Sequence, residues 1–457
     1  MPYSHTTFSD LKTYLSQKLG DTAKTFWVDA ELGIYINEAL RTFGLLTGFW
    51  RDRGTINSVA STAFYDITTL QNGSSQNLLA YSVTDRNLIE IIQYHFLESA
   101  SSQSSWTGTE MFTLNDLRYA IQRRRDQFLA DTGIVVTRSV ITVVSPAIGR
   151  ETLTDSIMDV RRAAWVGASP LNYYVPLWRE DERMLTAAGA TWNTNSNTPE
   201  AYSIMAPPPL QLQLAPPPVA TGQLELLTVN SGAALNPASS ATILGIPDDL
   251  TPGVKWGAMA DLLSKDGPAR DPIRAAFCEQ RYQQYVQLAR LLPVVIHAEI
   301  NGVSTIPITL QELESSTPNW ENIQTTLDHP ATDLAICAPN MIALSPVPFD
   351  VNTSITLDVV RRTTVLVNDI DPVQIGREQL EALLDYAEHL ALFKVGGMEW
   401  QSTQIQAESF LVESTTYNQR VSAMARAVVS SSEQSQREKQ DTPRRKSNRG
   451  IGALKDA

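Results

Sequence analysis

The chain has 457 residues, of which 43 % are hydrophobic and 19 % charged, a balance that predicts a folded protein of roughly two to four domains. Its net charge of −13 excludes the overall basic footprint of a general DNA-binding protein. With only two cysteines, no signal-peptide pattern and no run of about 18 apolar residues, we expect a soluble protein from a reducing compartment, without a disulfide framework or a membrane span.

The first predicted elements are two helices near the N-terminus. Leu11, Leu15 and Leu19 recur at helical spacing, and a second apolar series runs through 32–43. We expect Asp29 to cap the second helix. Its end is predicted at the glycine of "LLTGFW".

Short strand-like pieces follow this helix. The stretches "TINSVASTAFYDIT" and "NLIEIIQYHF" both read as β-structure, with a turn at Asn72–Gly73 between them. Further along, "IVVTRSVITVVS" and "SIMDVRRAAWV" are predicted strands as well. Each group follows a helix that ends at a glycine, which indicates a helix, a stop and then strands.

The predicted unit of a helix, a glycine stop and strands occurs twice in the sequence. The stretch "FWVDAELGIYINEALRTFGLLTGFWRDRG" from residue 26 aligns without a gap with "FTLNDLRYAIQRRRDQFLADTGIVVTR" from residue 112. The matched positions include Trp27 with Phe112, Leu32 with Leu117, Ile36 with Ile121, Phe43 with Phe128, Gly48 with Gly133, and Arg53 with Arg138. The alignment indicates an internal repeat.

A second repeat covers the remainder of the chain. "MAPPPLQLQLAPPP" resembles "CAPNMIALSPVPF", the strands "GQLELLTV" and "TSITLDVV" follow, and each copy then enters a helix led by proline. The matched positions are Pro176 with Pro307, Trp192 with Trp320, Pro199 with Pro330, Leu210 with Ile342, Leu212 with Leu344, and Leu262–Leu263 with Leu383–Leu384. We expect Trp192 and Trp320 to be equivalent buried anchors.

The repeats predict an α+β fold in which helical-bundle elements carry antiparallel β-sandwich-like insertions, in tandemly duplicated modules whose halves are interleaved or consecutive. The predicted divisions are 1–110 and 111–175 for two helix-plus-strand halves, 176–293 and 294–430 for two β-plus-helix modules, and 431–457 for a flexible basic tail.

The sequence offers little sign of a catalytic site. His5, His95, His297, His329 and His389 are scattered and show no metal-ligand spacing. The two cysteines, Cys278 and Cys337, occupy apolar positions in a predicted helix and a predicted strand, as structural thiols do. No phosphate-binding glycine loop or nucleophile elbow is present, and the carboxylates of "REDERM" and "LQELES" are expected on solvated faces.

We therefore expect no enzyme activity, no cofactor and no metal. A carboxylate-based hydrolase stays open as an alternative because carboxylate pairs leave no sequence signature. The tryptophans recur between the copies, which favours core packing over an exposed sugar-binding platform.

The final segment differs from the remainder. "SSSEQSQREKQDTPRRKSNRGIGALKDA" has too few apolar residues to fold alone, and it is basic on an acidic protein. We expect either a solvated tail or a segment that docks on a neighbour. The candidate docking residues are Arg444, Arg445, Lys446, Arg449, Ile451 and Leu454.

Three blocks together resemble a known family. The pattern "W.D.EL..YINEALR" before a glycine stop, then "P.AY......L.L.P.P...G.L.L", then "IPDDLTPGVKWGAMADLLSKDGPARD....A.....RY" is similar to the head-to-tail adaptor, or neck, proteins of tailed bacteriophages. The blocks span 27–41, 199–226 and 246–282. The family usually has one copy of each block and about half this length, so the doubling is a departure.

The resemblance implies a structural virion protein without catalytic residues, made in the host cytoplasm. It implies a ring of about twelve copies beneath the portal, joining capsid to tail and surrounding the DNA channel. The implied partners are the portal protein, tail proteins and further copies of the chain, with passing contact with genomic DNA and no membrane contact. Alternatives are a tail-tube, terminator or fibre-docking protein, and then a carbohydrate-binding or hydrolytic tail protein.

Overall fold

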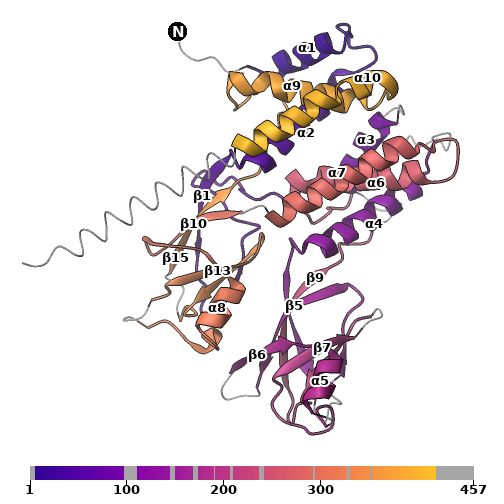
Figure 1. The fold of residues 1–457 in the computed structure, drawn as a ribbon. Coiled ribbons are helices and arrows are strands. Elements are labelled where there is room, and N and C mark those ends of the chain that lie inside the picture. Colours follow the sequence, from indigo (N-terminus) through magenta and orange to yellow (C-terminus); the bar gives the residue numbers. More distant parts are fainter. Residues whose placement is uncertain are drawn as a thin grey trace, which may run out of the picture.

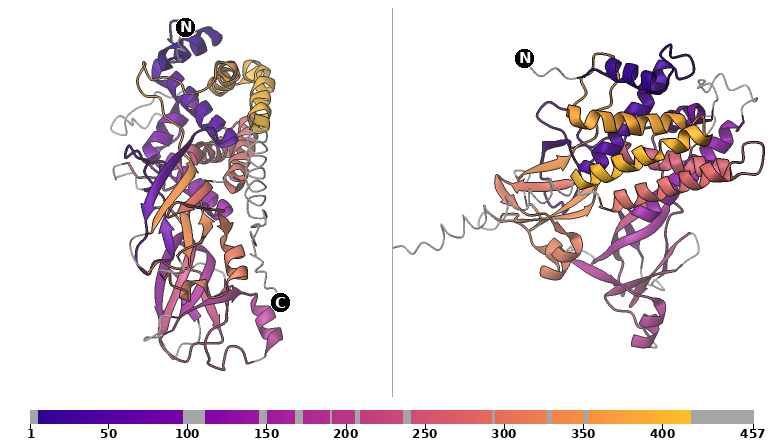
Figure 2. Two further views of the ribbon diagram at one scale, coloured as in Figure 1. Left: turned by 90° about the vertical axis from the view of Figure 1, so that its left-hand side faces the viewer. Right: turned by 45° about the horizontal axis from the view of Figure 1, so that its top comes forward.

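The structure is a computed structural model that describes residues 6–96, 111–144, 150–167, 173–189, 191–205, 209–235, 241–291, 294–326, 330–349 and 353–417. It has a mixed α+β fold, as the sequence predicts. The long helices gather at one end of the molecule, and two β units extend from them side by side (Figure 1). The two views in Figure 2 show the same division between helices and strands.

Two sets of helices make up the helical end. The first set is α1 (Phe8–Lys18), α2 (Asp29–Thr47), α9 (Arg377–Leu392) and α10 (Gly397–Ser402), after which residues 404–417 are also helical. The second set is α3 (Asp85–His95), α4 (Leu114–Thr132), α6 (Thr251–Ser264) and α7 (Pro272–Leu291). In each set the helix before the strands packs on a helix after them, α2 on α9 and α4 on α6.

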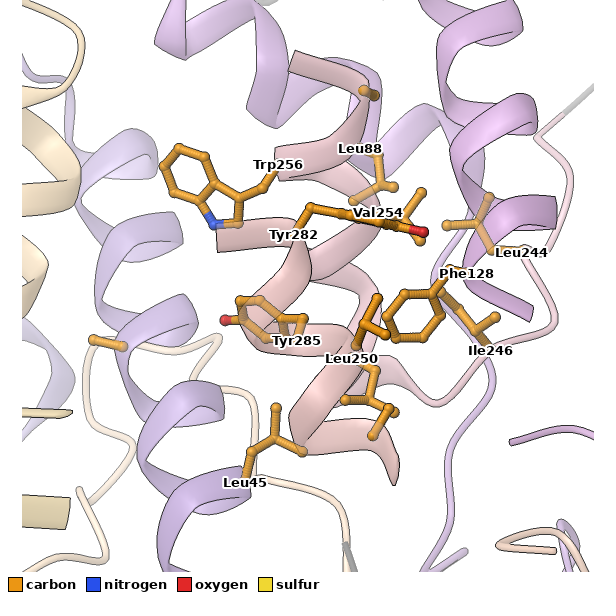
Figure 3. Close-up of a cluster of buried hydrophobic side chains, with 14 of the residues drawn as sticks. Leu45, Leu88, Phe128, Leu244, Ile246, Leu250, Val254, Trp256, Tyr282 and Tyr285 are labelled. Atoms are coloured by element: carbon orange, nitrogen blue, oxygen red, sulfur yellow. The ribbon is translucent and has the colours of Figure 1, made fainter. Parts of the chain in front are cut away.

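One apolar core joins the two sets. Leu45 of α2, Phe128 of α4, Trp256 of α6, and Tyr282 and Tyr285 of α7 are all buried in it. Figure 3 shows these side chains converging between the helices. The helical end is therefore one packed body rather than two separate bundles.

Both α2 and α4 end at a glycine with left-handed backbone, as predicted. Gly48 has φ 57° and Gly133 has φ 61°, and each donates its backbone N–H to the carbonyl oxygen four residues earlier. L-residues with a Cβ adopt this conformation at a cost of about 1 kcal/mol. These glycines turn the chain from the helix directly into the strands.

We expect Gly48→Ala to lower the free energy of unfolding by about 1 kcal/mol. An added Cβ would meet only Val360 Cγ2 at 3.6 Å, an ordinary contact, so the loss arises from the backbone conformation. Urea unfolding measures it, with Gly73→Ala as control because a Cβ there meets nothing within 4 Å. An alanine at position 48 that is as well tolerated as one at position 73 would contradict this explanation.

The first β unit contains two four-stranded sheets around a common apolar cluster. The sheet nearer the helices has the order β1-β15-β10-β11, and the other has the order β12-β13-β14-β2. The elements are β1 (Arg51–Asn57), β2 (Phe64–Asp66), β10 (Val295–Ile300), β11 (Val303–Thr305), β12 (Ile308–Thr309), α8 (Leu310–Ser316), the 3-10 helix η3 (Trp320–Asn322), β13 (Asp333–Ala338), β14 (Met341–Ser345) and β15 (Ser354–Val360).

The second β unit is one seven-stranded sheet in the order β3-β9-β5-β6-β7-β8-β4. Its two outer strands, β3 and β4, are consecutive in sequence and the sheet curls around its own apolar cluster, close to a barrel. The elements are β3 (Thr137–Val143), β4 (Arg150–Thr152), β5 (Ile157–Val166), β6 (Tyr174–Arg179), α5 (Glu182–Ala188), β7 (Ala201–Met205), β8 (Gln211–Ala215) and β9 (Gly222–Asn230); the 3-10 helix η2 (Asp248–Leu250) then leads into α6.

The two units pair their strands in the same order. In the first unit β1 pairs with β15, β15 with β10, and β10 with β11; in the second, β3 pairs with β9, β9 with β5, and β5 with β6. Each unit then has a parallel pair, β12 with β13 or β6 with β7. Two antiparallel pairs follow, β13 with β14 and β14 with β2 in the first unit, and β7 with β8 and β8 with β4 in the second. The strands of the first unit come from residues 51–66 and 295–360, and those of the second, from residues 137–230, are inserted between them.

Three local predictions were wrong. "NLIEIIQYHF" forms α3 and no strand, because a capping box at Thr84 and Asn87 starts a helix whose apolar residues recur at three and four. Asp29 does not cap α2: Val28 is the N-cap residue, and Asp29 instead pairs with Lys12 and Lys24.

The third error is the alignment of β8 with β14. Leu214 faces Tyr202 across the β7–β8 pair, and Leu344 faces Leu334 at the same place in the β13–β14 pair. Leu344 therefore corresponds to Leu214 and not to Leu212. A slip of two residues leaves every side chain on its own face, so alternation alone does not detect it.

Candidate assembly interface

The two β units meet at a buried arginine. Arg162 of β5 has an exposed side-chain fraction of only 5 %, and its guanidinium forms ion pairs with Glu314 of α8 and Glu321 of η3. The carboxylate of Glu225, on the neighbouring strand β9, lies 3.4 Å from Arg162 Nη1. The aromatic rings of Phe64 and Trp320 cover the guanidinium, with ring centroids 5.4 and 5.9 Å from Cζ.

Further contacts fix the same junction. Arg138 of β3 holds Glu225 from the other side, with its Nε 2.8 Å from the carboxylate. The side chain of Asn322 accepts a hydrogen bond from the backbone N–H of Tyr174 and donates one to its carbonyl, both at 2.7 Å. Asn340, between β13 and β14, bonds the backbone of Val136 in the same way at 2.9 Å. These contacts hold the two β units in one orientation.

The charges at the junction shift each other's protonation. Burial raises the pKa of Glu321 to about 7. The positive charge of Arg162 lowers this pKa, and the negative charge of Glu225 raises it. Burial opposes the charge on Arg162, but the carboxylates of Glu321 and Glu314 outweigh it and raise the pKa of the guanidinium. Arg162 is therefore always charged, whereas Glu321 titrates near neutral pH.

We expect the stability gained from protonated Glu321 to be lost as pH rises. The folded-state pKa of about 7 lies above the ordinary value of 4.5, so the folded protein binds this proton more tightly than the unfolded chain. The contribution is complete below pH 4.5 and disappears as the pH passes 7. Urea unfolding from pH 5 to pH 8 should show wild type losing stability relative to Glu321→Gln.

The control for this measurement is Glu399→Gln, on the exposed surface of α10. Its stability should follow that of wild type over the whole pH range. A difference between wild type and Glu321→Gln that stays constant with pH would contradict the assigned titration.

A second junction lies between the two sets of helices. Lys255 of α6 is fully buried and forms an ion pair with Glu38 of α2, whose other carboxylate oxygen accepts a 3.1 Å hydrogen bond from Trp256 Nε1. His95 Nε2 lies 3.2 Å from Lys255 Nζ. Burial, and then the charge of Lys255, keep the pKa of His95 well below its usual value, so its imidazole is neutral and accepts from the ammonium.

The other sequence candidates for chemistry lie apart from one another. His297 is on β10, with Nδ1 3.4 Å from Asp358, and His389 stacks on Trp400 inside the helical core. Cys278 is buried in α7 and Cys337 lies partly buried in β13, as predicted. Within the described ranges, no three His, Cys, Asp or Glu side chains cluster in a way that would hold a metal ion.

A polar cleft beside the Lys255 junction is lined in part by groups that already have partners. It has a volume of about 430 Å³ and lies between α2, α3 and the start of α6. Glu38 and Lys255 in its wall pair with each other, and Ser82 donates to Asp248 at 2.6 Å. These groups hold the fold together and do not form a nucleophile with an adjacent base.

The tryptophan prediction is correct only in part. Trp320 is 1 % exposed, but its sequence partner Trp192 is half-buried, and Trp178 is 72 % exposed. His5, His329 and the predicted docking residues, Arg444, Arg445, Lys446, Arg449, Ile451 and Leu454, lie outside the described residues.

Sequence reasoning missed the Arg162 junction. We expected the carboxylates of "LQELES" on a solvated face, yet Glu314 binds Arg162. The available signal was the arginine pair in the otherwise apolar strand "VRRAAWV", because a charge in a buried strand needs a partner. The sequence alone did not indicate that this partner is Glu314, 152 residues away.

No protein-family model matches the chain, and a search of curated proteins finds no match either. In the part of the chain that the structure covers, no helix is both long enough and apolar enough to cross a membrane. The Arg162 and Lys255 junctions are therefore the buried polar clusters from which we infer a function.

Proposed function

We propose that this chain is a head-to-tail adaptor of a tailed bacteriophage, built from two duplicated modules with sandwich-like β insertions. In this proposal about twelve copies form a ring beneath the portal, join capsid to tail and surround the DNA channel. The role is structural, with the portal protein, tail proteins and further copies of the chain as partners.

One observation carries the proposal. Two β units with the same strand order pack side by side within one chain, and the surfaces that join them are charged, buried and specific. A repeated unit that binds a copy of itself through two different surfaces has the property needed to build a ring. The sequence blocks that resemble adaptor proteins, at 27–41, 199–226 and 246–282, point the same way.

Two other functions are weaker candidates. Another neck or tail component, such as a tail-tube, terminator or fibre-docking protein, would share the ring-building property but not those sequence blocks. A hydrolytic or sugar-binding tail protein would need a site, and the acidic and basic side chains named above in the clefts and clusters mostly pair with each other.

The direct test uses purified protein mixed with portal rings of the same phage. Electron microscopy should show a second ring stacked coaxially on the portal. Binding to the tail tube but not to the portal would favour the other neck and tail components. Binding to neither would overturn the adaptor function.

We further expect weak binding of duplex DNA. A channel wall that held phosphates through many Lys and Arg contacts would impede passage of the genome, and its affinity would fall steeply with salt. At physiological salt, fluorescence anisotropy with a 30-base-pair duplex, a length of about three helical turns, should show no saturable binding. Tight binding would contradict a passive channel and direct attention to the basic segment 431–457.

A further inference from the structure

The shared strand order assigns counterparts between the two β units. In the second unit, Arg138 of β3 and Arg162 of β5 both lie opposite Leu227 of β9. In the first unit, Arg53 of β1 and His297 of β10 both lie opposite Asp358 of β15. The pairs Arg53–Arg138 and His297–Arg162 therefore occupy the same places on the outer faces of the two sheets.

The short helices also correspond. Leu313 of α8 and Leu185 of α5 are both buried, and the tryptophans 320 and 192 follow them at the same spacing. By that spacing, Thr186 is the counterpart of Glu314. Asn193, next to its tryptophan, is likewise the counterpart of Glu321.

Each unit has a helical segment that could cover the outer sheet face of the other unit, but only one of these two contacts is made inside the chain. The α8–η3 segment of the first unit covers the outer sheet face of the second unit, where the Arg162 and Glu225 side chains are 5 % and 1 % exposed. The corresponding face of the first unit is open: the Arg53, His297 and Asp358 side chains are 54 %, 35 % and 30 % exposed.

The corresponding helix of the second unit is open as well. Met184 of α5 is 62 % exposed, and residues 193–195 after Trp192 are exposed too. Beside α5 lies an open hollow of about 620 Å³, lined by residues 179–182 and 203–205. The corresponding part of the first unit, around Cys337, lies near the charge of Arg162.

We propose that a second copy of this chain completes the pattern: α5 and residues 191–195 of one subunit dock on the outer face of β1, β15 and β10 of the next. This inference rests on the proposed function in taking the partner to be another copy. The contact joins two different surfaces, so each subunit uses both, and repetition gives a closed ring or an open helix.

Both surfaces carry charged side chains. The hollow beside α5 carries Glu180, Asp181 and Glu182 against the single cation Arg179. The opposing face brings Arg53 and His297 to the positions that Arg138 and Arg162 take inside the chain. On that face Arg53 already pairs with Asp358 and Glu299, and His297 lies beside Asp358, so the shared strand order and not net charge identifies the partner.

Crosslinking tests the contact. The double variant Thr186→Cys/His297→Cys places one thiol on each surface, and both positions lie outside the buried core, so folding should be retained. A short bis-maleimide should convert the oligomer into a ladder of multimers on a denaturing gel. Wild type, each single variant and Thr186→Cys/Gln283→Cys, whose second thiol is on α7, should give no ladder.

A second experiment transfers the internal ion pair to the subunit boundary. His297→Arg and Asn193→Glu together recreate the Arg162–Glu321 pair. We expect the double variant to assemble at about tenfold lower concentration than either single variant. Sedimentation velocity over a concentration series measures this, and circular dichroism checks that each variant is folded.

The outcomes separate this inference from the proposed function. Rings that form without a ladder and without coupling between positions 193 and 297 overturn the contact and leave the adaptor function standing. A ladder from open chains that never bind portal supports the contact and removes the adaptor function. A chain that stays monomeric at every concentration overturns the contact.

Discussion

Trp320→Ala is expected to lower the free energy of unfolding by about 3–5 kcal/mol, the usual loss when a large buried aromatic side chain is truncated. The indole is 1 % exposed, lies edge-on to Phe64 with ring centroids 5.6 Å apart, and covers the guanidinium of Arg162. Chemical denaturation of the purified variant measures the loss.

Its sequence partner provides a matched comparison. Trp192 is half-buried and donates from Nε1 to Thr186 Oγ1 at 3.2 Å, so Trp192→Ala should cost much less. Trp178→Ala, at a side chain 72 % exposed, should leave stability nearly unchanged. If Trp192→Ala weakens assembly while the monomer keeps its stability, the docking surface gains independent support. Equal destabilisation by the variants at 192 and 320 would contradict the burial difference.

Arg162→Met is the second change with a large expected effect. It removes the cation and leaves Glu225 and Glu321, 1 % and 2 % exposed, without their shared buried partner. Removing one member of a buried ion pair typically costs about 3–5 kcal/mol. The free energy of unfolding from urea titration should fall by that amount.

Two further variants test whether the ion pairs of Arg162 cause this loss of stability. Arg162→Met/Glu321→Gln should recover part of the loss, because the neutral side chain no longer needs the cation. Arg161→Met, at a neighbouring side chain 46 % exposed, should cost less than about 1 kcal/mol. A small effect of Arg162→Met, or no recovery in the double variant, would show that the junction does not depend on this charge.

Local chemistry made much of the fold predictable. The helices α2 and α4, their glycine ends and the strands that follow are determined by apolar spacing and by a backbone conformation that favours glycine. Apolar spacing also predicted the order of strands and helices in the second predicted repeat. The segment 85–95 failed because a short apolar run rich in isoleucine and aromatic residues suits a strand or a helix equally.

The candidate interface was much less predictable. Arg162 finds Glu225 63 residues away and Glu321 159 residues away, and no periodic pattern connects such positions. The match of Arg53 with Arg138 was visible in the sequence. Only the strand pairing shows that His297 and Arg162 also occupy equivalent positions on the two sheets. The structure then shows that the sheet face of the second unit is covered and that of the first unit is open.

We propose that this chain builds a closed ring from repeated units, and single-particle electron microscopy of the purified protein can show such a ring. We expect annuli of one fixed symmetry, with a mass of about twelve times the 50.4 kDa chain and with α5 of each subunit packed on the β1-β15-β10 face of its neighbour. Particles that remain single chains at every concentration, or rings whose subunits meet through other surfaces, would contradict it.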